Sequence, residues 1–412
     1  MHTGGMLLIA APGQGAQAPG FLSPWLELPG VAEQLARWSE LAGCDLIRCG
    51  TKADAEEIRD TAVAQPLLLA AALTAAGALA GGPDGPGLAG SPDRAPLLAG
   101  AAAGHSVGEL AAGVIAGVIS AGDAMRLVRV RSEAMARAAA AEQTGMTAVL
   151  GGDEAAVLAS IEAHGLTAAN VNAPGQVVAA GTMSELAAFA AHPPAGARLR
   201  PLSVAGAFHT VHMAPAVAAL RAAAAGVDVS DPVLALLSNR DGQVVSTGRD
   251  WMERIITQVS TPVRWDLCMR TMASTGVTAM LELPPAGTLT GIARRALPGV
   301  QLLGLKTPAG LDAARLLIAE HADGHADSHA PDWRLLVAPM SGTFRAGPGP
   351  AEHAAPGAAV SSGTELGQVE IRGGSHPVAP AFPATIIEWL VEDGDPVSTG
   401  QPLVRLQPDS SD

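Results

Sequence analysis

The sequence has few lysines, and this scarcity limits the partners that it can attract through its general charge. Only Lys52 and Lys306 are lysines among the 25 basic residues, and the formal net charge of the 412 residues is −14. Binding to nucleic acid requires a basic surface that displaces counterions from the phosphates. We therefore expect no nucleic-acid partner, and any anionic partner must meet a local patch of arginines.

Cysteine is also scarce, and the pattern predicts neither a metal site nor disulfides. Cys44, Cys49 and Cys268 lack the spacing of metal ligands, so no metal is expected. The first five residues lack the basic stretch and the cleavage site of a signal peptide. An odd number of cysteines without an export signal is typical of reduced thiols, so we expect a cytoplasmic protein.

Long apolar runs are missing as well. The apolar fraction is 48%, but much of it is alanine. The segments 67–72 and 101–103 are too short, and too interrupted by glycine, proline or charge, to span a bilayer. The sequence therefore predicts a soluble protein without a membrane partner.

What the sequence does contain is a GxSxG pentapeptide at residues 104–108, followed by Glu109. This pattern presents a serine, here Ser106, on a strained turn between a strand and a helix, where it is usually a nucleophile. Glycines flank the serine because the backbone there adopts angles that a Cβ atom disfavours. A chain with 48 glycines can produce the pattern by chance, so the interpretation needs partners elsewhere.

Three histidines are candidates for the base that such a serine needs. A serine hydroxyl is a poor nucleophile until a base takes its proton and donors stabilise the oxyanion. His209 follows the apolar stretch 202–204 and lies where a strand ends. His105 points away from the neighbouring serine on a sharp turn, and His212 has no comparable position. Position favours His209, although sequence alone leaves the choice open.

Arg131 is predicted to be buried in the helix expected for residues 123–141. At about 100° per residue, it falls among apolar residues, whereas the other arginines of this helix share the opposite, solvated side. A buried guanidinium needs an anionic partner, because leaving it unpaired among apolar groups is costly. Two interpretations stay open: a bound carboxylate, which suits the planar fork of arginine, or a salt bridge to Glu109 or Asp123.

A glycine-rich segment, 12–17, directly follows the predicted first strand at 6–11. It reads Pro-Gly-Gln-Gly-Ala-Gln. Its glycines let backbone N–H groups approach a ligand, as an oxyanion hole requires. A plain strand-to-helix turn is the alternative for these residues.

Alternating strands and helices predict an α/β fold with an inserted subdomain. After a loop at 81–96 and the helix at 123–141, the order is β-α-β-β-α-β, which is typical of a ferredoxin-like unit. The expected strands are 146–150, 166–171, 176–180 and 198–204, and the expected helices are 154–164 and 184–191. This small subdomain, 141–205, would be inserted in a large one formed by 1–140 and 206–320; a single large sheet is the alternative.

The last part of the chain has a different pattern. Residues 321–332 have the composition of a linker, although histidines at 321, 325 and 329 would also suit a metal-binding strip on a helix. Residues 333–408 then read as an all-β domain with an internal repeat. Gly357, Val360, Ser361, Gly363 and Leu366 recur 37 positions later as Gly394, Val397, Ser398, Gly400 and Leu403.

Taken together, the motifs from about residue 7 to 320 resemble malonyl-CoA:acyl carrier protein transacylases, most closely those of high-GC actinobacteria. The resemblance rests on the Pro-Gly-Gln-Gly-Ala-Gln segment from Pro12, the pentapeptide with Glu109, Arg131, the Asn-Val-Asn-Ala-Pro-Gly-Gln segment from Asn170, the Gly-Ala-Phe-His segment ending at His209, Gln258 before Pro-Val-Arg-Trp from Pro262, and Gly-Thr-Leu-Thr-Gly from Gly287. It implies an α/β-hydrolase-like large subdomain and a ferredoxin-like small subdomain.

The resemblance also implies a malonyl transferase of fatty acid synthesis. Ser106 would carry the malonyl ester, and His209 would act as general base and then as general acid. Arg131 would bind the free malonyl carboxylate, and Gln258 would orient His209 through its main-chain carbonyl. The substrates would be malonyl-CoA and holo-acyl carrier protein, with no further cofactor. A polyketide-pathway transferase and a non-catalytic scaffold are the alternatives.

Further roles follow from the same resemblance. The backbone N–H groups of Gln14 and Val107 would form the oxyanion hole. Phe208 would select malonyl, because relatives with branched substrates carry a serine there, and Asn172 is an additional site candidate. The acidic carrier protein would dock on exposed arginines, for which Arg294, Arg295 and the arginines of the 123–141 helix are candidates.

The all-β domain resembles a biotin carboxyl carrier domain, a barrel-sandwich hybrid of the biotinyl/lipoyl type. Pro-Met-Ser-Gly-Thr-Phe from Pro339 and Val-Glu-Asp-Gly-Asp-Pro-Val from Val391 carry the likeness. Carriers present a modified lysine on a hairpin, but here that turn reads Arg-Gly-Gly-Ser from Arg372, and no lysine follows Lys306. Arginine lacks the primary amine, so no biotin is expected. The domain would dock acetyl-CoA carboxylase, or else be a passive or dimerising appendage.

Overall fold

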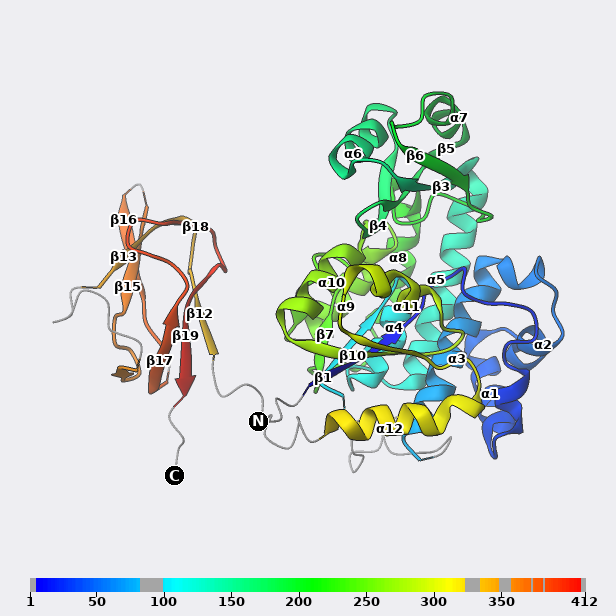
Figure 1. Cartoon of the computed structure of the whole chain (residues 1–412), viewed down its shortest axis with the longest axis horizontal. Helices are drawn as coiled ribbons and strands as arrows, with labels where there is room; N and C mark the ends of the chain where they lie inside the picture. Colours follow the sequence, from blue (N-terminus) through cyan, green and yellow to red (C-terminus); the bar gives the residue numbers. More distant parts are fainter. Residues whose placement is uncertain are drawn as a thin grey trace. The chain divides into compact units, whose positions relative to one another are not determined.

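The computed structural model describes residues 5–81, 99–322, 334–347, 357–371, 373–380 and 382–408. The chain forms two compact units, residues 1–325 and 326–412 (Figure 1). Each unit has hydrophobic cores of its own. Most of the predicted loop at 81–96 and two of the spaced histidines, 325 and 329, lie outside the described residues.

A mixed sheet of six strands, in the order β11-β10-β1-β2-β7-β8, lies at the centre of the first unit. Neighbours from β11 to β7 run parallel, and β8 pairs antiparallel with β7. The strands are β1 (Met6–Ala11), β2 (Ala101–Gly104), β7 (Ala235–Leu237), β8 (Val244–Val245), β10 (Val277–Glu282) and β11 (Gln301–Gly304). The predicted first strand at 6–11 is confirmed, and its residues after Met6 are all buried, as expected for a covered parallel strand.

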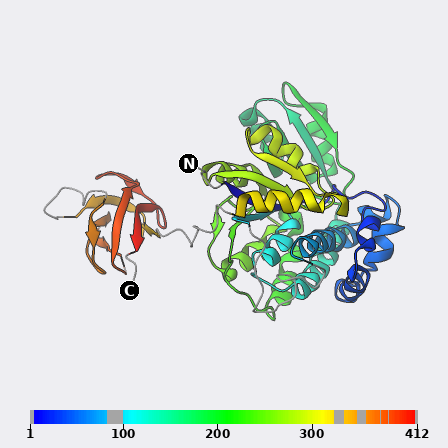
Figure 2. The same cartoon turned by 60° about the horizontal axis from the view of Figure 1, so that its bottom comes forward.

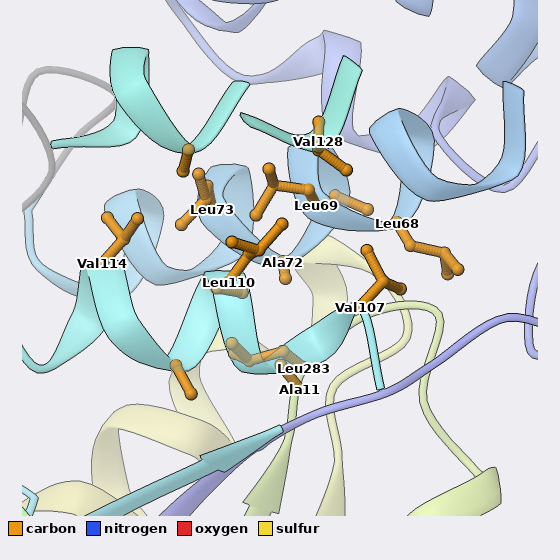
Figure 3. Close-up of a cluster of buried hydrophobic side chains, with 14 of the residues drawn as sticks. Ala11, Leu68, Leu69, Ala72, Leu73, Val107, Leu110, Val114, Val128 and Leu283 are labelled. Atoms are coloured by element: carbon orange, nitrogen blue, oxygen red, sulfur yellow. The ribbon is translucent and has the colours of Figure 1, made fainter. Parts of the chain in front are cut away.

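Three helices form the main core with this sheet: α3 (Thr61–Leu79), α4 (Gly108–Ile115) and α5 (Ala121–Ala141). Figure 3 shows Leu69 and Leu73 of α3 facing Leu110 and Val114 of α4. Helix α3 is apolar on all sides and long enough to cross a membrane, but 89% of its apolar window is buried inside the protein. The apolar run is therefore longer than the predicted segment 67–72, and it serves as a core helix.

The other helices of this unit surround the same core. They are α1 (Val31–Ala42), α2 (Leu46–Thr51), α8 (Ala214–Ala224), α9 (Gly248–Gln258), α10 (Trp265–Ser274), α11 (Thr288–Ala296) and α12 (Leu311–Ala322), with 3-10 turns η1 (Ser23–Glu27), η2 (Glu57–Arg59), η3 (Val211–Met213) and η4 (Pro308–Gly310). Helix α12, yellow in Figure 2, packs against β1 and α3. It continues to Ala322, two residues into the predicted linker.

The predicted β-α-β-β-α-β segment forms a second sheet, in the order β6-β3-β5-β4-β9. Its elements are β3 (Thr144–Gly151), α6 (Glu154–Ala163), β4 (Thr167–Ala173), β5 (Gln176–Thr182), α7 (Met183–Ala191) and β6 (Ala197–Pro201). Helix α7 begins with a capping box, in which Thr182 and Glu185 bond each other's backbone N–H groups. The sheet also contains a strand that was not predicted, β9 (Val263–Arg264), which follows well after this segment in the sequence and pairs parallel with β4.

In the described residues, the second unit forms two four-stranded sheets, β12-β19-β17-β14 and β16-β15-β13-β18. The strands are β12 (Arg334–Val337), β13 (Gly342–Ala346), β14 (Ala359–Val360), β15 (Gly367–Ile371), β16 (Gly374–Val378), β17 (Ala384–Trp389), β18 (Pro396–Val397) and β19 (Pro402–Pro408). The repeated glycines share one conformation: φ is 91° at Gly357, 77° at Gly363, 93° at Gly394 and 79° at Gly400. The 37-residue repeat therefore reflects two equivalent pairs of left-handed turns, around the edge strands β14 and β18.

Candidate active site

The pentapeptide forms the tight turn between β2 and α4. Ser106 has a φ of 54°, a left-handed conformation that is uncommon for a residue with a side chain. A Cβ atom on Gly104 would lie 2.0 Å from the carbonyl carbon of Gly108, and one on Gly108 would lie 2.2 Å from the carbonyl oxygen of Ala11. The two glycines are therefore required by close backbone contact, and the turn holds the serine at the end of β2.

His209 lies within hydrogen-bond distance of the serine. Its Nε2 atom is 2.8 Å from Oγ of Ser106, and its Nδ1 atom is 2.9 Å from the main-chain oxygen of Gln258. Because a carbonyl only accepts, Nδ1 carries the proton, and Nε2 is free to accept from the serine hydroxyl. Burial, together with the positive charge of Arg131, lowers the pKa of His209 from 6.5 to about 3. The imidazole is therefore neutral near pH 7, as a base must be.

The two other histidines are engaged elsewhere. Nε2 of His105 lies 2.9 Å from Oδ1 of Asn172, and its ring packs edge-on against Trp265. His212 pairs with Glu142 at 2.7 Å. Neither is bonded to the hydroxyl of Ser106, so among these histidines the structure brings only His209 to the serine.

Arg131 is buried, with 1% of its surface exposed, and its guanidinium points at the same serine. It donates to Oγ of Ser106 at 3.3 Å, to Oε1 of Gln258 at 2.8 Å and to Oε1 of Gln65 at 2.5 Å. All three acceptors are neutral. Burial lowers the pKa of Arg131 to about 10, although the nearby charge of Glu109 opposes this shift.

The two interpretations of this arginine differ in the anion that it would meet. In the part of the chain that is described, Arg131 forms no ion pair: Asp123 pairs with Arg126, and Glu109 accepts from the side chain of Gln258. The internal salt bridge offered as an alternative is therefore not formed. A buried cation that meets only neutral acceptors is well suited to receive an anionic ligand.

The predicted oxyanion donors lie next to the serine. Among the described residues, no acceptor is bonded to the backbone N–H of Gln14 or Val107. The glycine-rich segment packs closely on the turn, since a Cβ atom on Gly13 would lie 2.8 Å from the carbonyl oxygen of His105. The side chain of Gln14 donates to the main-chain oxygen of Arg59 at 3.2 Å, which holds the segment in place.

A cavity of about 220 Å³ adjoins Ser106 and His209. Helix α11, strands β3, β4 and β5 and the Gln14 segment all contribute to its walls, so it lies between the second sheet and the turns that follow β1 and β2. Phe208 lines it with 6% of its surface exposed, and Asn172 lines it beside His105. The described residues contain no cluster of three or more His, Cys, Asp or Glu that could hold a metal ion.

Of two buried polar residues near the serine, Asn239 was not assigned a role from the sequence, and Glu109 was named only as an alternative partner of Arg131. Asn239 accepts from the backbone N–H of Ser106 and donates to the carbonyl oxygen of Gly104, both at 2.7 Å, so it clamps the turn. Its own backbone N–H donates to Glu109 at 2.7 Å. Nothing local distinguishes Asn239 in the sequence, whereas the position of Glu109 directly after the pentapeptide was a usable signal.

Comparison with known proteins identifies the family. A family model described as the acyl transferase domain matches residues 12–304. The malonyl CoA-acyl carrier protein transacylase of Mycobacterium tuberculosis (strain ATCC 25618 / H37Rv) is 53% identical over 310 residues, which cover 74% of this chain and 98% of that protein. The chain belongs to the malonyl CoA-acyl carrier protein transacylase family.

Solved transacylase structures share the architecture of the first unit. A crystal structure of MCAT from Mycobacterium tuberculosis is 52% identical, with a TM-score of 0.70, and the match covers 75% of this chain and 99% of that one. A malonyl-transacylase in complex with a type II polyketide acyl-carrier protein is 29% identical, with a TM-score of 0.69 and coverage of 76% and 99%. The family match ends at residue 304, so the second unit lies outside it.

Proposed function

We propose that this transacylase moves a malonyl group from malonyl-CoA to the phosphopantetheine thiol of acyl carrier protein, in fatty acid synthesis. The observation that carries the proposal is that one hydroxyl, Oγ of Ser106, contacts both a neutral histidine and a buried arginine. A nucleophile that faces a cation suits an acyl group with a second, free carboxylate. A scaffold without catalysis would have no need of a strained turn and a buried cation.

The reaction has two half-steps that use the same groups. Oγ of Ser106 attacks the thioester carbonyl while its proton passes to Nε2 of His209, and coenzyme A leaves with that proton as a thiol. The carrier thiol then attacks the malonyl-serine ester, its proton passes to His209, and His209 returns a proton to Ser106. The main-chain oxygen of Gln258 keeps the imidazole oriented, so a serine–histidine pair suffices without a carboxylate.

The backbone N–H groups of Gln14 and Val107 would stabilise the oxyanion in both half-steps. Neither donates to an acceptor in the described part of the chain. Fixed donors of this kind lower the barrier because they need no reorganisation as the negative charge develops. The glycines of the Gln14 segment allow this close approach of the backbone.

Arg131 would select the substrate. When malonyl binds, its carboxylate would replace the neutral acceptors of the Arg131 guanidinium, whereas an acetyl group has no carboxylate. Charge-assisted bonds at a buried site are worth on the order of a few kcal/mol, enough for a large preference. Phe208 lines the cavity beside His209, and its ring would crowd an α-methyl branch. Asn172 would keep His105 turned away from the serine.

A polyketide pathway is the second candidate, with the same chemistry. It is favoured by the resemblance to a malonyl-transacylase solved with a type II polyketide acyl-carrier protein. Both pathways would use the same site, because only the carrier protein differs. In either pathway we infer a cytoplasmic enzyme.

Among the arginine candidates, those of α11 suit carrier docking better than those of α5. Arg126 pairs with Asp123, and Arg129 pairs with Glu133 on the same helix. In the described residues Arg294 and Arg295 form no ion pair; Arg295 donates to the neutral Gln176, a residue of the cavity wall. Positive charge that is not neutralised, on a helix that lines the cavity, suits an acidic carrier protein.

For the fold we infer an α/β-hydrolase-like large subdomain (1–140 and 206–320), a ferredoxin-like small subdomain (141–205) and, after the linker 321–332, a biotinyl/lipoyl-like barrel-sandwich hybrid (333–408). The strand order β6-β3-β5-β4 supports the second assignment, and eight strands in two sheets with a turn repeat support the third. The turn between β15 and β16 includes Arg372, which lies outside the described residues.

The second unit would act without biotin, because no lysine follows Lys306. We infer that it docks acetyl-CoA carboxylase, the enzyme that produces malonyl-CoA. A passive or dimerising appendage is the alternative for this unit.

Malonyl transfer is tested with labelled malonyl-CoA and holo-acyl carrier protein. Label should move to the carrier in the presence of the enzyme and should remain on coenzyme A with Ser106→Ala. Transfer at the same rate by both proteins would contradict the proposal.

A further inference from the structure

Glu109 is a buried carboxyl group that the mechanism above does not use. It lies in the first turn of α4 and has 2% of its surface exposed. Oε1 accepts from the backbone N–H of Asn239 at 2.7 Å, and Oε2 accepts from Nε2 of Gln258. An acidic residue in the first turn of a helix often stabilises the positive end of the helix dipole. Here both carboxylate oxygens bond residues of other segments, so the side chain has a further role.

The partner that matters is the side-chain amide of Gln258. Its Oε1 accepts from Nη2 of Arg131 at 2.8 Å, and its Nε2 donates to Glu109 and, at 3.2 Å, to the main-chain oxygen of Ser106. The main-chain oxygen of the same residue accepts from His209. Gln258 therefore touches the nucleophile, the base and the arginine, and it is 4% exposed.

An amide has two ends of nearly equal shape, one a donor and the other an acceptor. Arginine only donates, so the oxygen of Gln258 must face Arg131; the NH₂ group in that place would set donor against donor. Glu109 and, at 3.2 Å, the main-chain oxygen of Ser106 accept at the opposite end of the amide. Together they determine which end is left for the arginine, and Glu109 is the side chain of the two.

We propose that Glu109 is a positioning residue, which fixes the orientation of the Gln258 amide and through it the direction of the Arg131 guanidinium. The inference rests on the proposed function, in which that guanidinium binds the malonyl carboxylate. Burial raises the pKa of Glu109, while the N–H groups of Asn239 and Gln258 and the charge of Arg131 oppose that rise by stabilising the ionised form. These three opposing groups are the partners through which the carboxylate would position the amide.

Glu109→Gln separates this role from simple packing. The new side chain has the same size and keeps an oxygen for Asn239, but it presents NH₂ to Nε2 of Gln258. The Gln258 amide then either turns, so that Arg131 loses its acceptor, or stays with its NH₂ group against another NH₂ group; both weaken its hold on the guanidinium. We expect kcat/KM for malonyl-CoA to fall about tenfold to hundredfold, the effect of one charge-assisted hydrogen bond, while acetyl-CoA changes little. The ratio of malonyl to acetyl transfer to Ser106 falls accordingly.

The matched control is Glu253→Gln on α9, the helix that ends at Gln258. Glu253 is exposed and pairs with Arg221, so the same chemical change there should leave the donor ratio unaltered. Glu109→Asp is the second test: its carboxylate is withdrawn by about 1.5 Å, which should loosen the amide and lower the ratio as well. Thermal melting shows which variants fold.

The outcomes separate the inference from the proposed function. An unchanged malonyl-to-acetyl ratio in either folded Glu109 variant overturns the positioning role, as does an equal loss with both donors. If the unmodified enzyme forms no malonyl adduct at all, it is the proposed function that fails.

Discussion

Nη2 of Arg131 lies 3.3 Å from Oγ of Ser106. The guanidinium and the nucleophile thus face the same small space, and a short acyl group bound to the serine starts beside a buried positive charge. Among the described residues no carboxylate neutralises that charge directly, because Glu109 reaches it only through the amide of Gln258.

Removing the guanidinium should remove the donor preference. For Arg131→Ala we expect kcat/KM with malonyl-CoA to fall about hundredfold, with little change for acetyl-CoA, because only malonyl has a carboxylate to lose its partner. Arg131→Lys keeps a charge without the planar fork and should recover part of the preference. Steady-state kinetics with both donors measure the ratio, and an unaltered ratio in Arg131→Ala would contradict the carboxylate role.

Acid should destabilise the fold in part through His209. Its pKa is lowered from 6.5 to about 3. Between these two pH values the imidazole is therefore protonated in the unfolded chain but not in the folded protein. The free energy of unfolding therefore falls as the pH falls from about 6.5 to 3, on the order of a few kcal/mol from this residue. Urea unfolding at pH 7 and 4.5 should show a smaller loss in His209→Asn. An equal loss in both proteins would show that His209 is not the source.

Charge on α11 should matter for the carrier but not for coenzyme A. We expect Arg294→Glu to raise KM for acyl carrier protein several-fold and to leave KM for malonyl-CoA unchanged, with the effect shrinking at high salt. The matched control is Arg126→Glu, since Arg126 already pairs with Asp123 on the other helix. Equal effects of the two substitutions would exclude α11 as the docking helix.

The second unit should be dispensable for chemistry. A chain truncated after residue 325 retains the whole first unit and every residue placed in the site. Malonyl transfer to free carrier protein should then proceed at the rate of the full chain. Loss of transfer by a truncated protein with unchanged thermal melting would show that the second unit takes part in catalysis.

Local motifs predicted most of the elements and much of the site. The pentapeptide predicted the turn of Ser106 because the close contact between Gly104 and Gly108 lies within the motif itself. Helical periodicity predicted the burial of Arg131, which is 1% exposed. The β-α-β-β-α-β order could also be predicted, because the apolar residues of each element recur with the period of a strand or of a helix.

Long-range contacts could not be predicted in this way. Asn239 lies 133 residues after Ser106 and holds its backbone N–H, yet nothing in the sequence around it differs from an ordinary loop. Strand β9 has two residues, too few to show an apolar periodicity. It forms because its backbone can pair with the edge of β4. The sequence left a salt bridge from Arg131 to Glu109 open, since the intervening side chain of Gln258 belongs to a distant helix.

The central claim is that Ser106 carries a malonyl ester, and mass spectrometry of peptides after brief incubation with malonyl-CoA tests it most directly. The account predicts the added mass of one malonyl group on the peptide that contains Ser106, its absence in Ser106→Ala, and its loss when holo-acyl carrier protein is added. A malonyl group on another residue, or no adduct on this peptide under any condition, would contradict the account.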